Sequence, residues 1–359
     1  MYIIDDYDLA TKILGSNSVE VMPLRDYISK LQNNVNIDLT LLTKFLSHSP
    51  FFLEGNEHKI HKRIFKETFG KKNLSYFLPF FEDKIESVTK SLDFSIDIDL
   101  IDYCFEIAKK IIRPIIMGEN LVLMDDFEKR LYYAQKVAEP LLSIRELVKL
   151  EGEVQYLLDT LKKSFEINNT DSKNTMLSYI NSENEINLSY DNKLILLLVA
   201  YGSMSPFIQT LGNVFFEILS NKEKYFVREK FSEEIFFENL ENIIYNSASL
   251  LNIYRIVKKD FIIDEKFFKE GTYILIKITN ENNISEQNNC NLAKPSLEFG
   301  HGAHSCPGAM ISKSIIAMVI PIFFAIHKNI SIKDWTFEQS IKTAKSLKNL
   351  KVEKNEKYK

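Results

Sequence analysis

Apolar residues recur at helical spacing along most of the chain, and this periodicity constrains the fold more than any other feature. It predicts helices over Leu74–Leu92, Ile101–Met117, Asp125–Val148, Val154–Phe165, Lys193–Leu219, Glu233–Leu251 and Ala309–His327. Strand-like stretches are few, namely Met1–Asp5, Arg255–Asp264 and Gly271–Thr279. The last two of them predict a small sheet late in the chain. The sequence therefore indicates a mainly α protein with a small β part.

Length and composition bound the class of protein. The 359 residues are 45% hydrophobic, enough to bury a large core, and we expect a single domain over residues 1–359. The net charge of −4 and the pI of about 6.0 give no general attraction to nucleic acid or to an anionic membrane. The three cysteines, Cys104, Cys290 and Cys306, are odd in number and far apart, which argues against a disulfide framework and for a reducing cytoplasm.

Two segments bear on membrane targeting. The N-terminus carries acids directly after its first apolar residues and lacks the basic start of a signal peptide. The longest apolar run, Ile315–Ile326, is too short to span a bilayer and contains Pro321. We expect this run to be a buried helix with a kink.

The stretch Leu297–Met310, LEFGHGAHSCPGAM, gathers three glycines around one cysteine, although the whole chain has only 11 Gly. Pro307 suits a first helical position, which would place Cys306 at the N-cap, where the helix dipole favours a thiolate. The glycines permit positive φ angles and close backbone approach to something flat and bulky. A thiolate on such a loop suits haem iron, so Cys306 is the predicted metal ligand. The alternative is an ordinary buried cysteine beside a flexible loop.

The same stretch resembles the haem-binding signature of the cytochrome P-450 family, here the soluble bacterial type. The fixed positions of the signature are occupied by Phe299, Gly300, Gly302, His304, Cys306 and Gly308. The resemblance implies the family's fold and a haem b with Cys306 as its axial thiolate ligand. It also implies that His304 contacts a haem propionate and that Phe299 packs beside the sulfur.

Two further segments extend the resemblance. Glu57–Phe65 resembles the family's C-helix, which implies that His58 and Lys62 bind propionates, and their i, i+4 spacing puts both on one helix face. The segment beginning at Arg255 resembles the strand after the K-helix, whose arginine also binds a propionate. For Lys62 and Arg255 the alternative is an ordinary solvated charge.

The sequence departs from the family in its K-helix. Asn242 and Tyr245 stand where the family has Glu-x-x-Arg, and no arginine follows Arg255. Neutral packing can replace a buried charge network, so we expect the fold to survive, with Asn242 and Tyr245 hydrogen-bonding instead. We also expect a shortened N-terminus and a shortened meander, because the segment Asn282–Phe299 is several residues short for the family.

A second departure concerns the helix that crosses the distal face of the haem in this family and carries an acid–alcohol pair for proton delivery. Val199–Asn213 resembles that helix. One alignment places Ser205 and Pro206 at the acid and alcohol positions, and the other places Ser203 and Met204 there. Neither contains a carboxylate, so Ser203 and Ser205 are the candidate catalytic residues. Pro206 would bend the helix and admit water, or it is only a kink in a core helix.

These features imply a haem-thiolate oxidoreductase, with a monooxygenase or oxidase of a small secondary-metabolite intermediate as the leading expectation. Losing one positioned proton donor costs about 10²–10⁴ in rate, so peroxide use and redox-neutral or coupling chemistry stay open, as does a catalytically dead recruitment module. The basic stretch His58–Lys72 predicts docking of an acidic ferredoxin or flavodoxin, the alternative being a solvated helix face. We expect a monomer without nucleic-acid or membrane partners.

Overall fold

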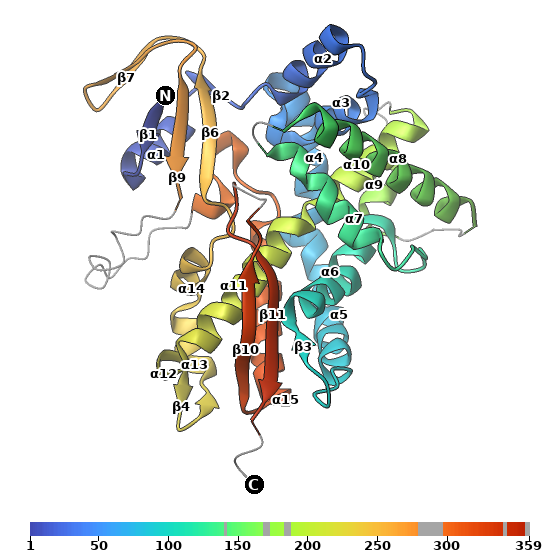
Figure 1. The fold of residues 1–359 in the computed structure, drawn as a ribbon, viewed down its shortest axis with the longest axis vertical. Coiled ribbons are helices and arrows are strands. Elements are labelled where there is room, and N and C mark those ends of the chain that lie inside the picture. The colour runs from blue at the N-terminus through green and yellow to red at the C-terminus, as the bar shows by residue number, and fades with distance from the viewer. Residues whose placement is uncertain (140–141, 168–172, 183–187, 279–296, 340–342, 356–359) are drawn as a thin grey trace. The chain divides into compact units, whose positions relative to one another are not determined.

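The computed structural model describes residues 1–139, 142–167, 173–182, 188–278, 297–339 and 343–355. Helices predominate in these ranges and the strands are short (Figure 1), which confirms the predicted fold class. The chain divides into two compact units. Unit 1 comprises Met1–Glu20, Phe81–Ile107 and Pro206–Lys359, and unit 2 comprises Val21–Phe80 and Ala108–Ser205. That the whole chain behaves as one domain stays a prediction.

Unit 1 contains a four-stranded sheet with the strand order β1-β9-β6-β2. Its strands are β1 (Tyr2–Ile4), β9 (Tyr273–Lys277), β6 (Asn252–Val257) and β2 (Val19–Glu20). β1 pairs parallel with β9, with Tyr2 opposite Ile274, whereas β6 runs antiparallel to both β9 and β2. Buried and half-buried residues alternate along β6, as they do where one face of a strand covers a core. The small sheet predicted late in the chain is confirmed by the pairing of β6 with β9, and the predicted N-terminal strand joins it. The single strand predicted over Arg255–Asp264 is divided, because β6 ends at Val257 and β7 belongs to another pair.

The helix α1 (Tyr7–Leu14) packs on this sheet. It begins after Asp6, whose carboxylate accepts a hydrogen bond from the Leu9 amide at 2.7 Å and so satisfies one of the free N–H groups of the first turn. Its apolar face buries Leu9, Ile13 and Leu14 in a core shared with Ile274 and other sheet residues. The apolar stripe of the sequence therefore fixes which side of α1 faces the strands.

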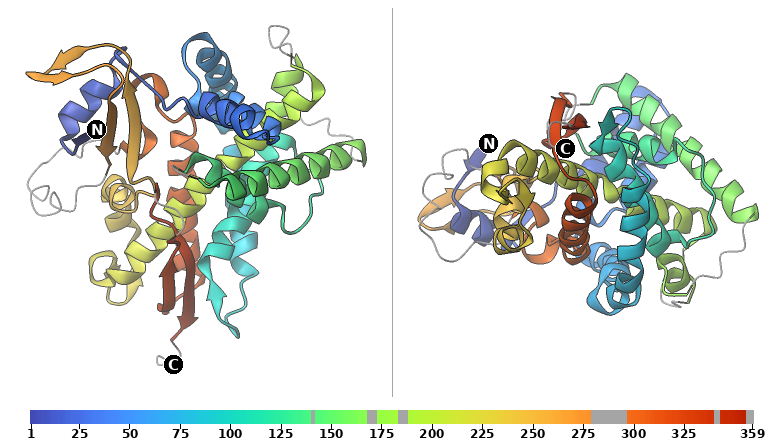
Figure 2. Two further views of the ribbon diagram at one scale, coloured as in Figure 1. Left: turned by 45° about the horizontal axis from the view of Figure 1, so that its top comes forward. Right: turned by 90° about the horizontal axis from the view of Figure 1, so that it is seen from below.

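Unit 1 also contains strands that the sequence did not predict. β10 (Ile330–Phe337) and β11 (Leu347–Lys354) form the long red ribbon in Figures 1 and 2, and β3 (Ile98–Asp99) pairs with β11. The frequent lysines of β11 hide its alternation, although Leu350 and Val352 are buried. Two smaller hairpins pair β4 (Phe226–Val227) with β5 (Lys230–Phe231) and β7 (Phe261–Ile263) with β8 (Lys266–Phe268).

The remaining helices of unit 1 are parts of α5 (Lys71–Lys90) and α6 (Leu100–Met117), most of α11 (Met204–Ser220), α12 (Lys222–Tyr225), α13 (Glu233–Glu238), α14 (Leu240–Asn246) and α15 (Ala309–Ile326). α11 and α15 meet through the rings of Phe215 and Phe323, whose centroids are 4.9 Å apart. α15 is only partly buried, through Ile315, Ile316, Phe323 and four further apolar residues, and it stays helical through Pro321.

By length and composition alone, two helical stretches among the described residues are apolar enough to cross a membrane, Tyr190–Ser220 and Ala309–Ile326. Of the most apolar part of each, 83% and 44% respectively is buried inside the protein. The burial of Tyr190–Ser220 is typical of a core helix, which is apolar all round, whereas Ala309–Ile326 is only partly covered.

Unit 2 is helical. Its elements are α2 (Leu24–Val35), α3 (Thr40–Ser47), α4 (Gly55–Phe69), α7 (Phe127–Ala134), α8 (Ile144–Ile167), α9 (Met176–Ser182), α10 (Tyr190–Gly202) and the other parts of α5 and α6. α3 lacks a capping side chain of its own, and Glu151 of α8 accepts hydrogen bonds from the amides of Leu41 and Leu42, both at 2.8 Å. A carboxylate from another helix thus satisfies the N-terminal amides of α3.

The helix predictions are confirmed for α5, α6 and α15, which lie close to their predicted bounds although each contains a proline. The prediction of one helix over Asp125–Val148 is wrong, because α7 ends at Ala134, a 3₁₀ turn covers Gln135–Ala138 and α8 begins at Ile144. A new helix begins here because Ser143 and Glu146 form a capping box, in which the Ser143 amide donates to the Glu146 carboxylate at 2.8 Å and the Glu146 amide donates to the Ser143 hydroxyl at 3.3 Å. The helix predicted over Glu233–Leu251 is likewise broken into α13 and α14.

Candidate functional site

Residues 299–306, here called the cysteine loop, form a closed turn in unit 1. The amide of Cys306 donates a hydrogen bond to the carbonyl of Phe299 at 2.6 Å, which joins the two ends of the loop. One 3₁₀ turn, Leu297–Phe299, leads into the loop and a second, Gly302–His304, lies inside it. The residues predicted from the signature are thus brought together in one compact segment.

Backbone geometry requires two of the glycines. Gly300 and Gly302 have φ angles of 67° and 66°, in the left-handed region that favours glycine. A Cβ on Gly300 would lie 2.7 Å from the carbonyl oxygen of His304, and one on Gly302 would lie 3.1 Å from the carbonyl oxygen of Leu14 in α1. The loop is therefore closed tightly on itself and packed against α1.

The start of α15 differs from the prediction. The N-cap residue is Gly308 and the helix begins at Ala309, so the expected placement of Cys306 at the N-cap is wrong. The turn from Cys306 to Ala309, marked by an amide–carbonyl contact of 3.4 Å, precedes the helix. Gly308 has φ −88°, so it does not use the positive φ that glycine permits, and a Cβ would make an ordinary 3.7 Å contact with the Cys306 sulfur. The dipole of α15 acts on this sulfur from beyond the first turn, where its effect is weaker.

The described cysteines differ in accessibility. Cys104 lies fully buried in α6, and burial raises the pKa of its thiol well above the ordinary value. Cys306, the last residue of the cysteine loop, is partly exposed. Cys290 lies outside the described residues. Of the two that the structure describes, only Cys306 can present its sulfur to a ligand.

The basic side chains predicted as propionate ligands are buried. Lys62 is 8% exposed and His58 is 7% exposed, both on α4 in unit 2. Arg255 is 9% exposed on β6 in unit 1, where its Nη1 donates to the carbonyl of Tyr254 at 2.8 Å. The alternative that Lys62 and Arg255 are solvated charges is therefore wrong, since lysine and arginine are seldom buried without a partner.

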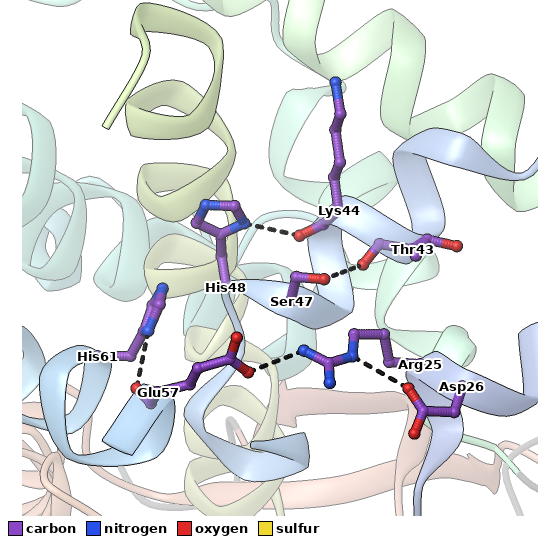
Figure 3. Close-up of polar contacts among 8 residues, drawn as sticks. All are labelled: Arg25, Asp26, Thr43, Lys44, Ser47, His48, Glu57 and His61. Carbon is purple, nitrogen blue, oxygen red and sulfur yellow. Dashed lines mark hydrogen bonds and ion pairs between the residues drawn. The ribbon is translucent and has the colours of Figure 1, made fainter. Parts of the chain in front are cut away.

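A polar network braces α4 within unit 2 (Figure 3). Arg25 binds the Glu57 carboxylate at 2.9 Å, and the Glu57 carbonyl accepts a hydrogen bond from His61 Nδ1 at 3.0 Å. His48 Nδ1 donates to the Lys44 carbonyl at 2.7 Å, and the two histidine rings meet edge to face with centroids 5.4 Å apart. Burial lowers the pKa of both histidines, so at neutral pH they are uncharged hydrogen-bond donors to the backbone.

The predicted distal helix is interrupted. α10 ends at Gly202 and α11 begins at Met204, because Pro206 has no N–H to donate to the Gly202 carbonyl. The hydroxyl of Ser203 donates to the carbonyl of Ala200 at 2.5 Å. Ser205 is 3% exposed, and its hydroxyl has no hydrogen-bond partner in the described part of the chain. The two predicted serines therefore differ, and only Ser205 has an uncommitted hydroxyl.

Sequence reasoning missed Gln135, which lies in the 3₁₀ turn after α7. Its Nε2 is buried without a partner among the described residues, and it would be only 2.0 Å from a Cβ on Gly202. The absence of a side chain on Gly202 is thus what admits the Gln135 amide to the end of α10. No local pattern around either residue signals this approach.

Sequence reasoning also missed Glu298, which directly precedes the cysteine loop. Its carboxyl group accepts hydrogen bonds from Thr210 of α11 and from both the amide and the hydroxyl of Ser249, the latter two at 3.1 Å. Burial raises the pKa of this carboxyl group. The signal in the sequence was a charged residue inside an apolar and glycine-rich stretch.

The expected substitutes for the missing K-helix pair do not form a buried network. Asn242 is exposed and Tyr245 is only half-buried on α14, because the helix turns its apolar residues Ile243 and Ile244 inward. The expectation that Asn242 replaces a buried partner is therefore wrong. The shortened meander, residues 282–299, lies mostly outside the described residues.

No family model and no curated protein matches the sequence. P450BioI, solved in complex with acyl carrier protein ligated to hexadec-9Z-enoic acid, matches with a TM-score of 0.79 and 14% identity, over 98% of this chain and 91% of that chain. The tirandamycin C-bound monooxygenase TamI matches with a TM-score of 0.76 and 15% identity, over 98% and 89%. CYP154A1 from Streptomyces coelicolor A3(2) matches with a TM-score of 0.73 and 15% identity, over 97% and 90%.

At such low identity the likeness establishes the fold alone. Each of the three matches spans nearly the whole of both chains. The mainly helical architecture with small sheets is therefore shared with these bacterial P450 structures. The chain has the cytochrome P-450 fold.

Proposed function

We propose that the protein is a haem-thiolate oxidoreductase, a monooxygenase or oxidase acting on a small intermediate of secondary metabolism. The observation that carries the proposal is the accessible Cys306 thiol on a closed glycine-containing loop, in a chain with the cytochrome P-450 fold. Haem b bound through this thiolate supplies the oxidising chemistry. Phe299 packs beside the sulfur in this proposal.

The chain's own residues hold the cofactor in this proposal. Cys306 binds the iron, and His304 and Arg255 of unit 1 bind propionates. His58 and Lys62 of unit 2 do the same. The burial of Lys62 and Arg255 supports these roles, because a cation removed from water is retained where an anion lies near it.

Proton delivery is assigned to the hydroxyl of Ser205. This hydroxyl is buried and uncommitted among the described residues, whereas that of Ser203 already bonds to Ala200. A hydroxyl both donates and accepts, so Ser205 can pass a proton from a water to a substrate oxygen without a carboxylate. The buried amide of Gln135, which approaches Gly202 at the end of α10, three residues before Ser205, is suited to hold that water.

The electron donor is assigned by charge. Lys59 and Lys66 on α4, and Lys71 and Lys72 at the start of α5, are exposed and form a basic surface on an acidic protein. An acidic ferredoxin or flavodoxin would dock there, with a rate that falls as salt is added. A reducing cytoplasm suits a protein with an accessible thiol.

Spectroscopy of the reduced protein with carbon monoxide tests the proposal. We expect a Soret band at about 450 nm, the signature of a thiolate ligand in this family. The variant Cys306→Ala should lose this band, whereas Cys104→Ala and Cys290→Ala should keep it. Retention of colour, band and turnover by Cys306→Ala would overturn the proposal.

Turnover experiments separate the remaining chemistries. A monooxygenase forms product with a reductant, a redox partner and dioxygen, and incorporates labelled oxygen from O₂. An enzyme that forms product only with peroxide, or without a net oxidant, belongs to the alternative classes. A recruitment module would show no substrate-induced change of the haem spectrum.

A further inference from the structure

A buried hydrogen-bonded cluster in unit 1 connects three segments that are distant in sequence. Glu298 precedes the cysteine loop, Thr210 lies on α11, and Ser249 lies in the connection between α14 and β6. One carboxylate oxygen of Glu298 accepts hydrogen bonds from the Thr210 hydroxyl, the Ser249 amide and the Ser249 hydroxyl. The hydroxyls of Thr210 and Ser249 are also in contact, at 3.2 Å.

The donors around Glu298 are neutral and buried. Thr210 is 3% exposed and Ser249 is 1% exposed, so water does not compete for these bonds. The ammonium group of Lys313 acts on the carboxyl group electrostatically and is itself paired with Glu241 at 2.6 Å. A buried acid held by three converging donors is expensive to displace, because each donor would lose its partner.

The connection that carries Ser249 is itself fixed to α11. Asn213 Nδ2 donates to the carbonyl of Ser247 at 3.2 Å and to that of Lys345 at 2.9 Å, and the Lys345 amide donates to the Ser249 carbonyl at 2.6 Å. Glu298 therefore binds to a frame that is already held in place. A side chain tied to such a frame cannot move without breaking several hydrogen bonds.

The hydrogen-bonded cluster adjoins the cysteine loop in the sequence, because Glu298 directly precedes the first residue of the loop. Glu298 is bonded to Phe299, and the Phe299 carbonyl accepts the Cys306 amide at 2.6 Å. A second point of the loop is held where Gly302 packs against the carbonyl of Leu14. The glycines make this loop costly to order, so two fixed points determine where its sulfur lies.

We propose that Glu298 is a positioning residue that sets the location of the Cys306 sulfur by tying the start of the cysteine loop to α11 and to the α14–β6 connection. The inference rests on the proposed role of Cys306 as haem ligand. It goes beyond that role, because it assigns to a residue outside the signature the task of holding the ligand.

The test compares Glu298→Ala, Glu298→Gln and two control variants, using the purified protein with its cofactor. In Glu298→Ala we expect at least half of the long-wavelength Soret band of the reduced carbon monoxide complex to move to shorter wavelength. Amide hydrogen exchange over residues 300–306 should become about tenfold faster or more. Glu298→Gln keeps an acceptor oxygen and should retain most of the band.

The controls separate positioning from general destabilisation. Glu128→Gln alters a buried acid in unit 2, and Glu241→Gln removes the exposed partner of Lys313. Both should leave the Soret maximum and the exchange of residues 300–306 as in the parent protein. If Glu128→Gln moves them as far as Glu298→Ala does, the effect is general and the inference is wrong.

The outcomes distinguish this inference from the proposed function. If the parent shows the thiolate band and Glu298→Ala retains both band and exchange rates, Glu298 does not position the ligand although the function stands. If the parent lacks the band, the function fails, and unchanged exchange in Glu298→Ala then rejects the tether as well. Should Glu298→Ala not fold, Glu298→Asp, which is too short to reach its donors, takes its place in both measurements.

Discussion

Each unit contains a buried glutamate that joins segments distant in the sequence, and the two are satisfied differently. In unit 1, Glu298 accepts hydrogen bonds from the neutral groups of Thr210 and Ser249. In unit 2, Glu128 of α7 is 4% exposed, accepts the Tyr201 hydroxyl of α10 at 2.7 Å and pairs with Arg113 of α6 at 3.4 Å. The helix break next to Tyr201 is thus anchored by an ion pair, and the loop by an uncharged cluster.

The difference predicts how each anchor fails. Removal of one member of a buried ion pair leaves an uncompensated charge in the protein interior. Removal of a carboxyl group held by neutral donors leaves only unsatisfied hydrogen bonds, which cost less. The anchor of α10 should therefore be the more costly one to break, and the anchor of the cysteine loop the more easily replaced by a neutral side chain.

The largest expected effect is that of Glu128→Ala. Arg113 would keep its place among buried side chains without its carboxylate, so the free energy of unfolding should fall by about 3–5 kcal/mol. Urea denaturation followed by circular dichroism measures this change. The double variant Glu128→Ala/Arg113→Met should recover part of the loss, and a loss under about 1 kcal/mol would show that the pair is not an anchor.

The second largest effect, on activity and not on stability, is expected for Ser205→Ala, four residues after the Glu128 partner Tyr201. We expect product formation to fall by about 10²-fold, because the proposed proton donor is removed. Stability should hardly change, since the Ser205 hydroxyl has no partner in the described structure that could be lost. Ser203→Ala is the matched control, with less than a twofold effect on product formation. Equal effects of the two variants would contradict the assignment of Ser205.

The stability of Glu298→Gln relative to the parent protein should depend on pH. Burial raises the pKa of Glu298 above its ordinary value of 4.5, so the folded state keeps the proton to higher pH than the unfolded state does. This contribution to stability is fully present below the ordinary pKa and is lost as pH rises through the raised pKa. The variant has no such loss, so its deficit of about 1–3 kcal/mol at low pH should shrink as pH rises.

Denaturation of the parent protein and Glu298→Gln at several pH values measures this trend. A deficit that is constant with pH, or that grows as pH rises, would show that Glu298 is not a buried acid of raised pKa. Lys313 acts on Glu298 electrostatically, so Lys313→Met serves as a control for this influence.

The smallest expected effect belongs to Glu241→Gln, the exposed counterpart of the two buried acids. Glu241 binds Lys313 at 2.6 Å, but the two side chains are 46% and 30% exposed, so solvent screens the pair. The free energy of unfolding should change by less than about 1 kcal/mol, and less still at high salt. A larger change would mean that this surface pair also anchors α15.

The sequence predicted the features that depend on residues close together in the chain. The residues of the cysteine loop are contiguous, and His58 and Lys62 are one helical turn apart, so spacing alone placed them together and both proved buried. Pro206 likewise interrupts its helix through its own missing amide. These features depend on neighbours in the chain.

The anchors could not be predicted in this way. Glu298 meets partners 88 and 49 residues away, and Glu128 meets Tyr201 at a separation of 73 residues. No periodicity reports such encounters, because they depend on the packing of whole helices. The N-cap at Gly308 was missed for a different reason, since Pro307 is compatible with both a first helical position and the turn that it occupies.

The parallel pairing of β1 with β9 has a consequence for how the protein matures. Tyr2 finds its partner only at Ile274, and α1, which follows β1, supplies the carbonyl of Leu14 that backs Gly302. A nascent chain leaves the ribosome with its first strand unpaired until more than three quarters of the polypeptide has been synthesised. The contact that limits Gly302 of the cysteine loop is thus among the last to be completed, and a bulky fusion on Met1 should hinder cofactor loading more than one on Lys359.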